Sequence, residues 1–424
     1  MSSIFTKDIS IPRPRRPEFR RPEMRRPELR RPELRRPELR VPELRRGGGS
    51  RPTLGGPTIS MPRLHHGAPK GGAVVGLEIE AGSVAAVEAS GGGTVQVNKA
   101  GIRAMQPEAF RDGEVAEPDA VAAALRALFD EHGFSRQVRL GIANQRLVVR
   151  TLRLPAIENP SELDAAVRFS AQEQIAMPLD EAVIEHRVVA GVPPTAESPA
   201  RIDVMVVAAR REMILASLQP LRDAGLEPVG VDLSAFGMVR AVADFAGPIE
   251  PTIAGAPATA APATLYCNFG DTTNLAVARG RSCLFTRISA VGLEDIVGGL
   301  VSATGLSHQH AAMWLNHVGL RRPVEEIEGD ESTVARTRRA LEHGVASLVD
   351  ELRLSLDFYA AQETAATVER IVLCGTGSAI PELATEIESG IDLPITVGTP
   401  TALAGYDAAS AARLTLPLGL ALDA

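Results

Sequence analysis

Three short turns rich in small residues are the parts of this sequence best suited to binding chemistry. Each turn follows a short apolar stretch. Small residues allow backbone N–H groups to approach an anion such as a phosphate. The turns are therefore candidate nucleotide-binding segments, although the Gly-x-Gly of the third is a weak signal by itself. The ten candidate residues are Ala81, Gly82, Ser83, Gly270, Asp271, Thr272, Thr273, Gly375, Thr376 and Gly377.

Other kinds of catalytic or metal-binding chemistry have little support in the sequence. Cys267, Cys283 and Cys374 are far apart and odd in number, and no CxxC pair occurs. This pattern favours small core residues in a reducing compartment over a disulfide framework or a zinc site. The histidines form no HExxH motif, and His308 and His310 do not share a helix face because they are two residues apart.

The elements that must position the three turns read as strands. Two apolar stretches flank Glu80–Ser83, which predicts a β-hairpin over residues 74–89. The stretches TLYCNFG and TNLAVARG predict a second hairpin around residues 270–273, and RIVLCG predicts a buried strand before Gly375. Because a similar hairpin opens each half, the pattern indicates a duplicated architecture.

Helices separate these strands. Residues 119–132 place apolar side chains on one face and end at Gly133. A helix after Pro160 has Ser161 and Asp164 as a possible capping pair, with Pro178 at its end. The class is therefore α/β with mixed sheets. Further helices are predicted at 211–224, 307–315, 334–361 and 381–389, and further strands at 137–154, 182–190 and 201–208.

A basic segment precedes the folded part. Residues 15–44 are six copies of a pentapeptide, RRPEF, RRPEM, three RRPEL and RVPEL. Proline in every repeat blocks helix propagation, and one apolar residue in five cannot build a core, so we expect disorder or polyproline-like structure. Residues 47–72 read as a flexible Gly/Pro linker. Residues 1–70 carry a net charge of +11, whereas the remaining residues carry −18.

The arm is a candidate contact for an anionic membrane through residues 13–46, or simply a solvated tail. It has no interleaved aromatic residues for base stacking, so we expect no nucleic-acid partner. The sequence shows no apolar run long enough for a transmembrane helix and no signal peptide. We therefore expect a cytoplasmic protein that is peripheral at the inner face of the cell membrane.

The order of two hairpins and a late Gly turn resembles that of the actin/Hsp70 superfamily. A closer resemblance is carried, in order along the chain, by VGLEIEAGSVAAVE, LVVRTLRLP, SELDAAVRFSAQEQIAMPLDEAVIEHRVV (161–189), VMVVAAR, AGLEPVGVDLSAF, TRISAVGLEDI, LRLSLDFY and PLGLAL. With these segments, the chain from Val74 to Ala424 resembles the PilM family of type IV pilus assembly proteins, in the FtsA-like branch of that superfamily. The first segment is similar to the family's opening strand pair, and 161–189 closely resembles a further family pattern.

This resemblance implies a two-lobed actin-like ATPase fold with an inserted 1C subdomain. Lobe 1 would span 73–247 (1A, with 1C at about 136–208), lobe 2 would span 248–424 (2A and 2B), and 1–72 would be the arm and linker. In the family, a groove between 1A and 1C receives the cytoplasmic N-terminal peptide of PilN, a membrane protein. We therefore expect a pilus assembly scaffold. Other platform proteins, the assembly ATPase and a second copy of the chain are further expected partners.

In this superfamily the two hairpin turns cradle phosphates and the late Gly turn supports adenosine, but several key residues differ here. An added carboxylate repels a polyphosphate, and an amide supplies less charge to Mg²⁺ than a carboxylate. Glu80 is otherwise readable as an exposed turn residue. We expect weak or no ATP binding, with Mg²⁺ if ATP binds, and negligible hydrolysis. The departures are Glu78 for Asp, Glu80 for Gly, Ala85 for Lys, Asn268 for an acid, and Ala312 and Leu315 on the helix expected to contact ribose and base.

Two alternatives remain open on the sequence. The first is an actin-like ATPase in which ATP switches the groove. The second is an FtsA-like cell-division tether, for which the closing PLGLALDA lacks the expected amphipathic membrane helix.

Overall fold

The computed structural model describes residues 73–91, 94–192, 194, 199–243, 262–362 and 365–422. The predicted arm and linker, residues 1–72, lie outside this part of the chain. The predicted lobe boundary near residue 247 also lies outside it.

The first sheet opens with the hairpin predicted around Glu80–Ser83. Strands β1 (Val75–Glu80), β2 (Ser83–Ser90) and β3 (Gln96–Ala104) pair antiparallel, while β6 (Gln137–Ile142) and β10 (Glu227–Leu233) join in parallel on the other side of β1. The strand order is β3-β2-β1-β6-β10. Because helices cover both faces, β1 and β2 are almost continuously buried.

The second sheet repeats this plan. Strands β11 (Ala263–Phe269), β12 (Thr273–Arg279) and β13 (Ser282–Ser289) pair antiparallel, and β14 (Val368–Cys374) and β15 (Ile395–Val397) join in parallel beside β11. The order β13-β12-β11-β14-β15 matches the first sheet strand for strand. The duplicated architecture predicted from the two hairpins is confirmed.

Helices cover the outer face of each sheet. Helices α1 (Pro118–His132) and α3 (Arg211–Asp223) pack on the first sheet and with it form lobe 1. Helix α1 ends at Gly133, as predicted, with a φ of 60°. The second sheet and its outer helices form lobe 2. These helices are α5 (Leu293–Thr304), α6 (His308–Val318), α7 (Glu331–Ala360) and α8 (Leu383–Gly390).

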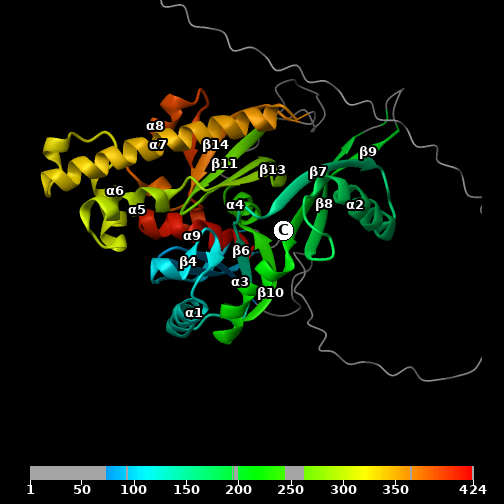
Figure 1. The fold of residues 1–424 in the computed structure, drawn as a ribbon, viewed down its shortest axis with the longest axis horizontal. Helices are drawn as coiled ribbons and strands as arrows, with labels where there is room; N and C mark the ends of the chain where they lie inside the picture. Colours follow the sequence, from blue (N-terminus) through cyan, green and yellow to red (C-terminus); the bar gives the residue numbers. More distant parts are fainter. Residues whose placement is uncertain are drawn as a thin grey trace, which may run out of the picture. The chain divides into compact units, whose positions relative to one another are not determined.

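Two helices lie between the sheets (Figure 1). Helix α4 (Ser234–Val242) packs against strands of both sheets, and α9 (Ala408–Ala421) packs against α4 and β1 to β3. Glycines permit this close approach, since a Cβ on Gly419 would lie 1.8 Å from the carbonyl oxygen of Gly237. The last helix of the chain therefore returns to lobe 1, and the lobes are not simply consecutive in sequence.

A three-stranded sheet is inserted between β6 and β10. It contains β7 (Val148–Pro155), β8 (Ala182–Val192) and β9 (Arg201–Arg210) in the order β7-β9-β8, and α2 (Pro160–Gln174) covers one face. The predicted start of the insert near residue 136 was too early, because β6 pairs within the first sheet.

The cap and the end of the helix after Pro160 differ from the predicted ones, and one small sheet was not predicted. The helix cap predicted at Ser161 and Asp164 was wrong, since Asn159 accepts the hydrogen bond from the Ser161 N–H. Helix α2 ends at Gln174, before Pro178. A small two-stranded sheet of β4 (Phe110–Arg111) and β5 (Glu114–Val115) follows β3 in sequence.

The three cysteines are buried and form no disulfide with one another. Among the described helices, none combines the length and apolar character needed to cross a bilayer.

We expect Gly419→Ala to lower the free energy of unfolding by about 1–3 kcal/mol, because the added methyl group would overpack the contact with Gly237. Gly299→Ala in α5 is the matched control. A Cβ there meets nothing within 4 Å, and helix propensity favours alanine by about 1 kcal/mol. Urea unfolding followed by circular dichroism measures both. Equal effects of the two variants would show that the α4–α9 approach does not matter for stability.

Candidate functional site

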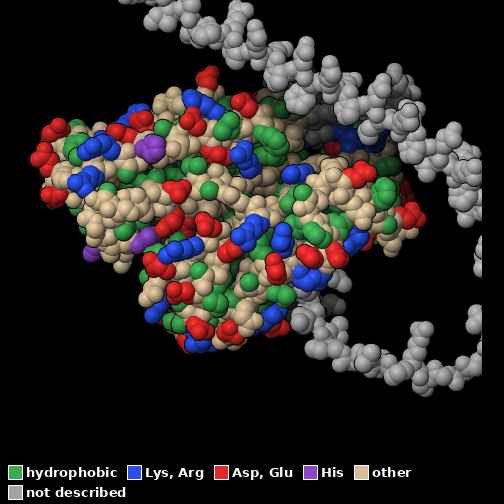
Figure 2. Space-filling model, in the orientation of Figure 1, with side chains coloured by type: hydrophobic (Ala, Val, Ile, Leu, Met, Phe, Trp, Pro, Cys, Tyr) green, Lys and Arg blue, Asp and Glu red, His purple; other side chains and the backbone are tan. Residues whose placement is uncertain are grey.

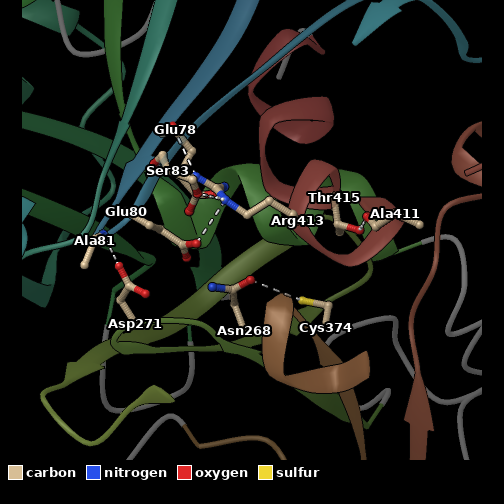
Figure 3. Close-up of polar contacts among 10 residues, drawn as sticks. All are labelled: Glu78, Glu80, Ala81, Ser83, Asn268, Asp271, Cys374, Ala411, Arg413 and Thr415. Carbon is tan, nitrogen blue, oxygen red and sulfur yellow. Dashed lines mark hydrogen bonds and ion pairs between the residues drawn. The ribbon is translucent and has the colours of Figure 1, made fainter. Parts of the chain in front are cut away.

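The first two predicted turns face each other across the lobes. The β1–β2 turn comes from lobe 1 and the β11–β12 turn from lobe 2, and the backbone N–H of Ala81 donates a hydrogen bond to Asp271 (Figure 3). Gly82 supports the tight turn with a φ of 81°, which other residues rarely adopt. A backbone donor that could face a phosphate is thus taken by a carboxylate of the other lobe.

Arg413 of α9 reaches the same place from between the sheets. Its Nη1 lies 2.6 Å from Glu78 Oε2, and its Nε lies 3.1 Å from Glu80 Oε2 and 3.0 Å from Ser83 Oγ (Figure 3). The side chains of Arg413 and Glu78 are only 6% and 8% exposed, and that of Glu80 is 14% exposed. The interpretation of Glu80 as an exposed turn residue was therefore wrong.

The carboxylates of Glu78, Glu80 and Asp271 lie near a single arginine, Arg413, so negative charge exceeds positive charge in this cluster. Burial, together with the charge of Glu80, raises the pKa of Glu78 to about 8 even though Arg413 opposes the shift. Burial and the charges of Glu80 and Glu294 raise the pKa of Asp271 well above its usual range. These shifts reflect negative charge that the folded protein compensates only in part.

Two cavities border the cluster. The larger, which we call the interlobe cleft, has a volume of about 910 Å³ and is lined by Glu78–Ala81, residues 107–115 and 140–146, Asp271, Thr272 and α5. The smaller, which we call the side pocket, has about 710 Å³ and lies against α5 and α6. Its walls are mostly apolar, and the Oγ1 atom of Thr376 and the Oδ1 atom of Asn316 have no hydrogen-bond partner there.

The structure brings six of the ten predicted residues to these cavities. Asp271 borders both cavities, as does Ala81, while Gly82, Ser83 and Thr376 line the side pocket and Thr272 lines the interlobe cleft. The other four residues do not line either cavity. They are Gly270, Thr273, Gly375 and Gly377.

Packing explains these four residues. A Cβ on Gly375 would lie 2.5 Å from Asn268 Oδ1, and one on Gly377 would lie 2.2 Å from the Phe269 ring, so both glycines let the turn after β14 approach β11. Gly270 faces Glu80 in the same way. Thr273 is fully buried and donates to the carbonyl oxygen of Val291 at 2.6 Å.

Sequence reasoning missed Arg413. The available signal was a single arginine inside a long apolar stretch, because a charge on a buried helix requires a partner. It also treated Ala85 only as a missing lysine, whereas Ala85 packs in the core against α9.

The phosphate side of the site fits a nucleotide poorly. Asp271 occupies the Ala81 N–H, and the Glu78 and Glu80 carboxylates lie beside the same turn. A polyphosphate placed here would meet uncompensated negative charge in a low-dielectric environment. The side pocket is more apolar, but Glu80 and Asp271 line it as well.

A second groove lies along the inserted sheet and adjoins the interlobe cleft, with which its smaller cavity shares Asn144, Gln145 and Asn274. Two cavities of about 570 and 280 Å³ share Val149, Arg150, Thr286 and Arg287. We call the combined space the insert groove; Phe358 also lines its larger cavity. The first lobe contributes residues 142–147. The Oγ1 atom of Thr286 is buried there without a hydrogen-bond partner.

A duplicated five-stranded sheet with two facing hairpin turns and helices between the sheets defines an actin-like ATPase fold. Within that class, a model of the type IV pilus assembly protein PilM family matches residues 76–416. The chain belongs to this family, and its role is in type IV pilus assembly.

This chain is similar to several solved structures. PilM in a PilM–PilN type IV pilus biogenesis complex is 25% identical, with 82% of this chain and 97% of that chain covered and a TM-score of 0.66. The ethanolamine utilization protein EutJ of Carboxydothermus hydrogenoformans is 12% identical, with coverages of 85% and 93% and a TM-score of 0.45. MreB5 of Spiroplasma citri bound to ADP is 12% identical, with coverages of 82% and 94% and a TM-score of 0.41.

We expect Arg413→Leu to lower the free energy of unfolding by about 3–5 kcal/mol, because it leaves Glu78 and Glu80 without their cation. Adding Glu78→Gln and Glu80→Gln to that variant should recover part of the loss. Denaturant unfolding at pH 8 provides the measurement. A triple variant less stable than Arg413→Leu alone would contradict this account of the cluster.

We expect Asp271→Asn to stabilise the protein more at pH 8 than at pH 5. The folded-state pKa of Asp271 is raised, so the folded protein retains a proton that the unfolded chain loses, and stability falls as pH rises through this window. Asparagine removes the effect and keeps an acceptor for the Ala81 N–H. Thermal melts at both pH values test this, with the exposed Asp392→Asn as control. The same melting-temperature difference at both pH values would count against it.

Proposed function

We propose that this protein is a scaffold of the type IV pilus inner-membrane platform, which binds the cytoplasmic N-terminal peptide of a PilN-like membrane protein. The observation that carries the proposal is the likeness to PilM solved with PilN, which extends over 97% of that chain. A peptide held in a groove between subdomains is an established mode of recognition.

The insert groove is the proposed peptide site. Lobe 1, the inserted sheet and β13 all contribute to it, so an extended peptide would contact the insert and both lobes. The unpaired Thr286 Oγ1 can accept a hydrogen bond from a peptide N–H. Phe285 and Phe358, with ring centroids 5.9 Å apart, offer an apolar surface, and Phe358 is 58% exposed.

The nucleotide site is proposed to be degenerate. Support comes from the Asp271 carboxylate on the Ala81 N–H and from the Glu78 and Glu80 carboxylates at the same turn. Arg413 ties that turn to the helix between the sheets without a ligand. The two lobes would then keep their arrangement without ATP, and hydrolysis would be negligible.

This role places the protein at the inner face of the cell membrane as a peripheral component. The PilN-like partner supplies the membrane attachment, and the assembly ATPase, other platform proteins and further copies of the chain are proposed neighbours. The basic arm, residues 13–46, remains a predicted second contact with anionic lipid.

Isothermal titration of the full chain with the N-terminal peptide of the PilN-like protein from the same genome tests the proposal. We expect saturable binding that does not change when Mg-ATP is added. Binding that requires Mg-ATP would instead support a nucleotide-dependent switch. Absence of binding in both conditions would overturn the proposed partner.

Phe358→Ala locates the peptide. We expect it to weaken peptide binding by about tenfold, since aromatic residues dominate such contacts. Phe169→Ala is the matched control, because Phe169 is 71% exposed on α2 and does not line the insert groove. Equal affinity of the two variants would place the peptide elsewhere.

A further inference from the structure

The interlobe cleft is lined by more acidic than basic side chains. At its rim, Arg111 lies 3.9 Å from Glu108 and Arg146 lies 2.8 Å from Glu114, so these charges largely cancel. Deeper in the cleft, His308 pairs with Glu294 at 2.7 Å. The inner carboxylates therefore determine the charge of the cleft.

The inner carboxylates are those of Glu78, Glu80 and Asp271, and they have too few cationic partners to balance their negative charge. Arg413 pairs with Glu78 and Glu80, whereas Asp271 accepts a hydrogen bond from the neutral backbone N–H of Ala81. Buried or partly buried carboxylates without a cation are costly, and a protein resolves this by protonating them or by binding a cation.

Asn274 supplies an independent sign of a ligand. It lies on β12 directly after the second hairpin turn, on the strand face directed toward α4, and it lines both the interlobe cleft and the smaller cavity of the insert groove, which adjoin there. Asn274 is only 3% exposed, yet its Oδ1 atom has no hydrogen-bond partner. A buried amide oxygen without a donor is uncommon in folded proteins. The cleft thus presents an unpaired acceptor in addition to carboxylates.

We propose that the interlobe cleft binds the guanidinium group of an arginine-bearing peptide segment from a partner protein. The site goes beyond the proposed peptide groove, since the insert groove and the cleft serve different ligands. Its chemistry is opposite to that expected of an actin-like phosphate site, because the cleft offers acceptors where a phosphate needs donors.

An arginine side chain matches these features better than a compact cation. Guanidinium is planar and carries five N–H donors, which can reach a carboxylate and an amide oxygen at the same time. It is also weakly hydrated and tolerates partial burial. A cleft of about 910 Å³ is large enough to admit a peptide side chain with part of its backbone.

The charged groups around the site predict how binding changes with pH. The inner groups are Glu78 and Glu80 from β1, Asp271 from the second turn, Glu294 from α5, His308 from α6 and Arg413 from α9. The other charged groups that line the cleft are Glu108, Arg111, Asp112, Glu114, Arg146 and Asp295. The pKa of Glu78 is raised to about 8 and that of Asp271 is also raised, so part of the negative charge is lost near pH 6. Affinity for a cation should therefore rise between pH 6 and pH 8.

Surface charge must be controlled for, because acidic and basic side chains are interspersed over the face drawn in Figure 2. Fluorescence anisotropy of a labelled hexa-arginine peptide with the full chain, at physiological salt, measures the affinity. We expect saturable binding that strengthens about tenfold from pH 6 to pH 8, as one additional ionised carboxylate would produce. Ordinary surface carboxylates are ionised at both values and give no such change.

Two matched pairs of charge-removing substitutions test whether the hexa-arginine peptide binds in the interlobe cleft. Glu80→Gln with Asp271→Asn should weaken binding about tenfold, whereas Glu325→Gln with Glu326→Gln, which changes the net charge equally at exposed positions, should weaken it less than about twofold. Phe358→Ala should leave peptide binding in the cleft unchanged, which separates this site from the insert groove.

Three results would overturn the proposal. The first is no saturable binding at pH 8, and the second is equal weakening by both charge-changing pairs, which would mean general surface attraction. The third is displacement of the peptide by millimolar Mg²⁺ with no effect of equal ionic strength from NaCl, which would mean a metal site. None of these results affects the titration that tests the PilN-like partner.

Discussion

The need to compensate buried charge governs the centre of this protein. Arg413 is buried on a mostly apolar helix between two sheets, and it can remain there only while Glu78 and Glu80 pair with it. This requirement fixes the position of α9 along β1 and the conformation of the first turn. Through Asp271, which accepts from that turn, it also fixes the approach of the second lobe.

Close backbone contacts also hold α9 against β1 and α4. Gly76, Gly237 and Gly419 let α9 approach β1 and α4 so closely that no side chain fits between them. Arg139 and Arg240 donate to the carbonyl oxygens of Gly419, Leu420 and Leu422, where the end of a helix leaves acceptors unsatisfied. A central region held in this way suits a scaffold, whose partners need a constant surface rather than a moving one.

This chain combines the fold of the actin-like ATPase class with an acidic centre. The duplicated sheets and facing turns of that class are present, and the carboxylates of Glu80 and Asp271 lie at the first turn. The family assignment accounts for pilus assembly, and the groove along the inserted sheet is the proposed peptide site. A fold can keep its packing while its central site acquires a different ligand preference.

Local pattern in the sequence was sufficient for the hairpins, the outer helices and the Gly133 helix end, since alternation, periodicity and glycine preference act over a few residues. It also located Ala81, Gly82 and Asp271 at the site. It misplaced the start of the insert, because whether β6 pairs with β1 or β7 depends on residues far away.

What the sequence determined by itself was the repeated strand plan and the acidic character of the first turn. Only the tertiary structure decided which cation meets those acids, because Glu78 and Arg413 are 335 residues apart. It also decided that Gly375 and Gly377 serve packing and that Asn274 faces the cleft unpaired. Ion pairing, close packing and hydrogen-bond satisfaction depend on distances in space, and local sequence pattern does not encode those distances.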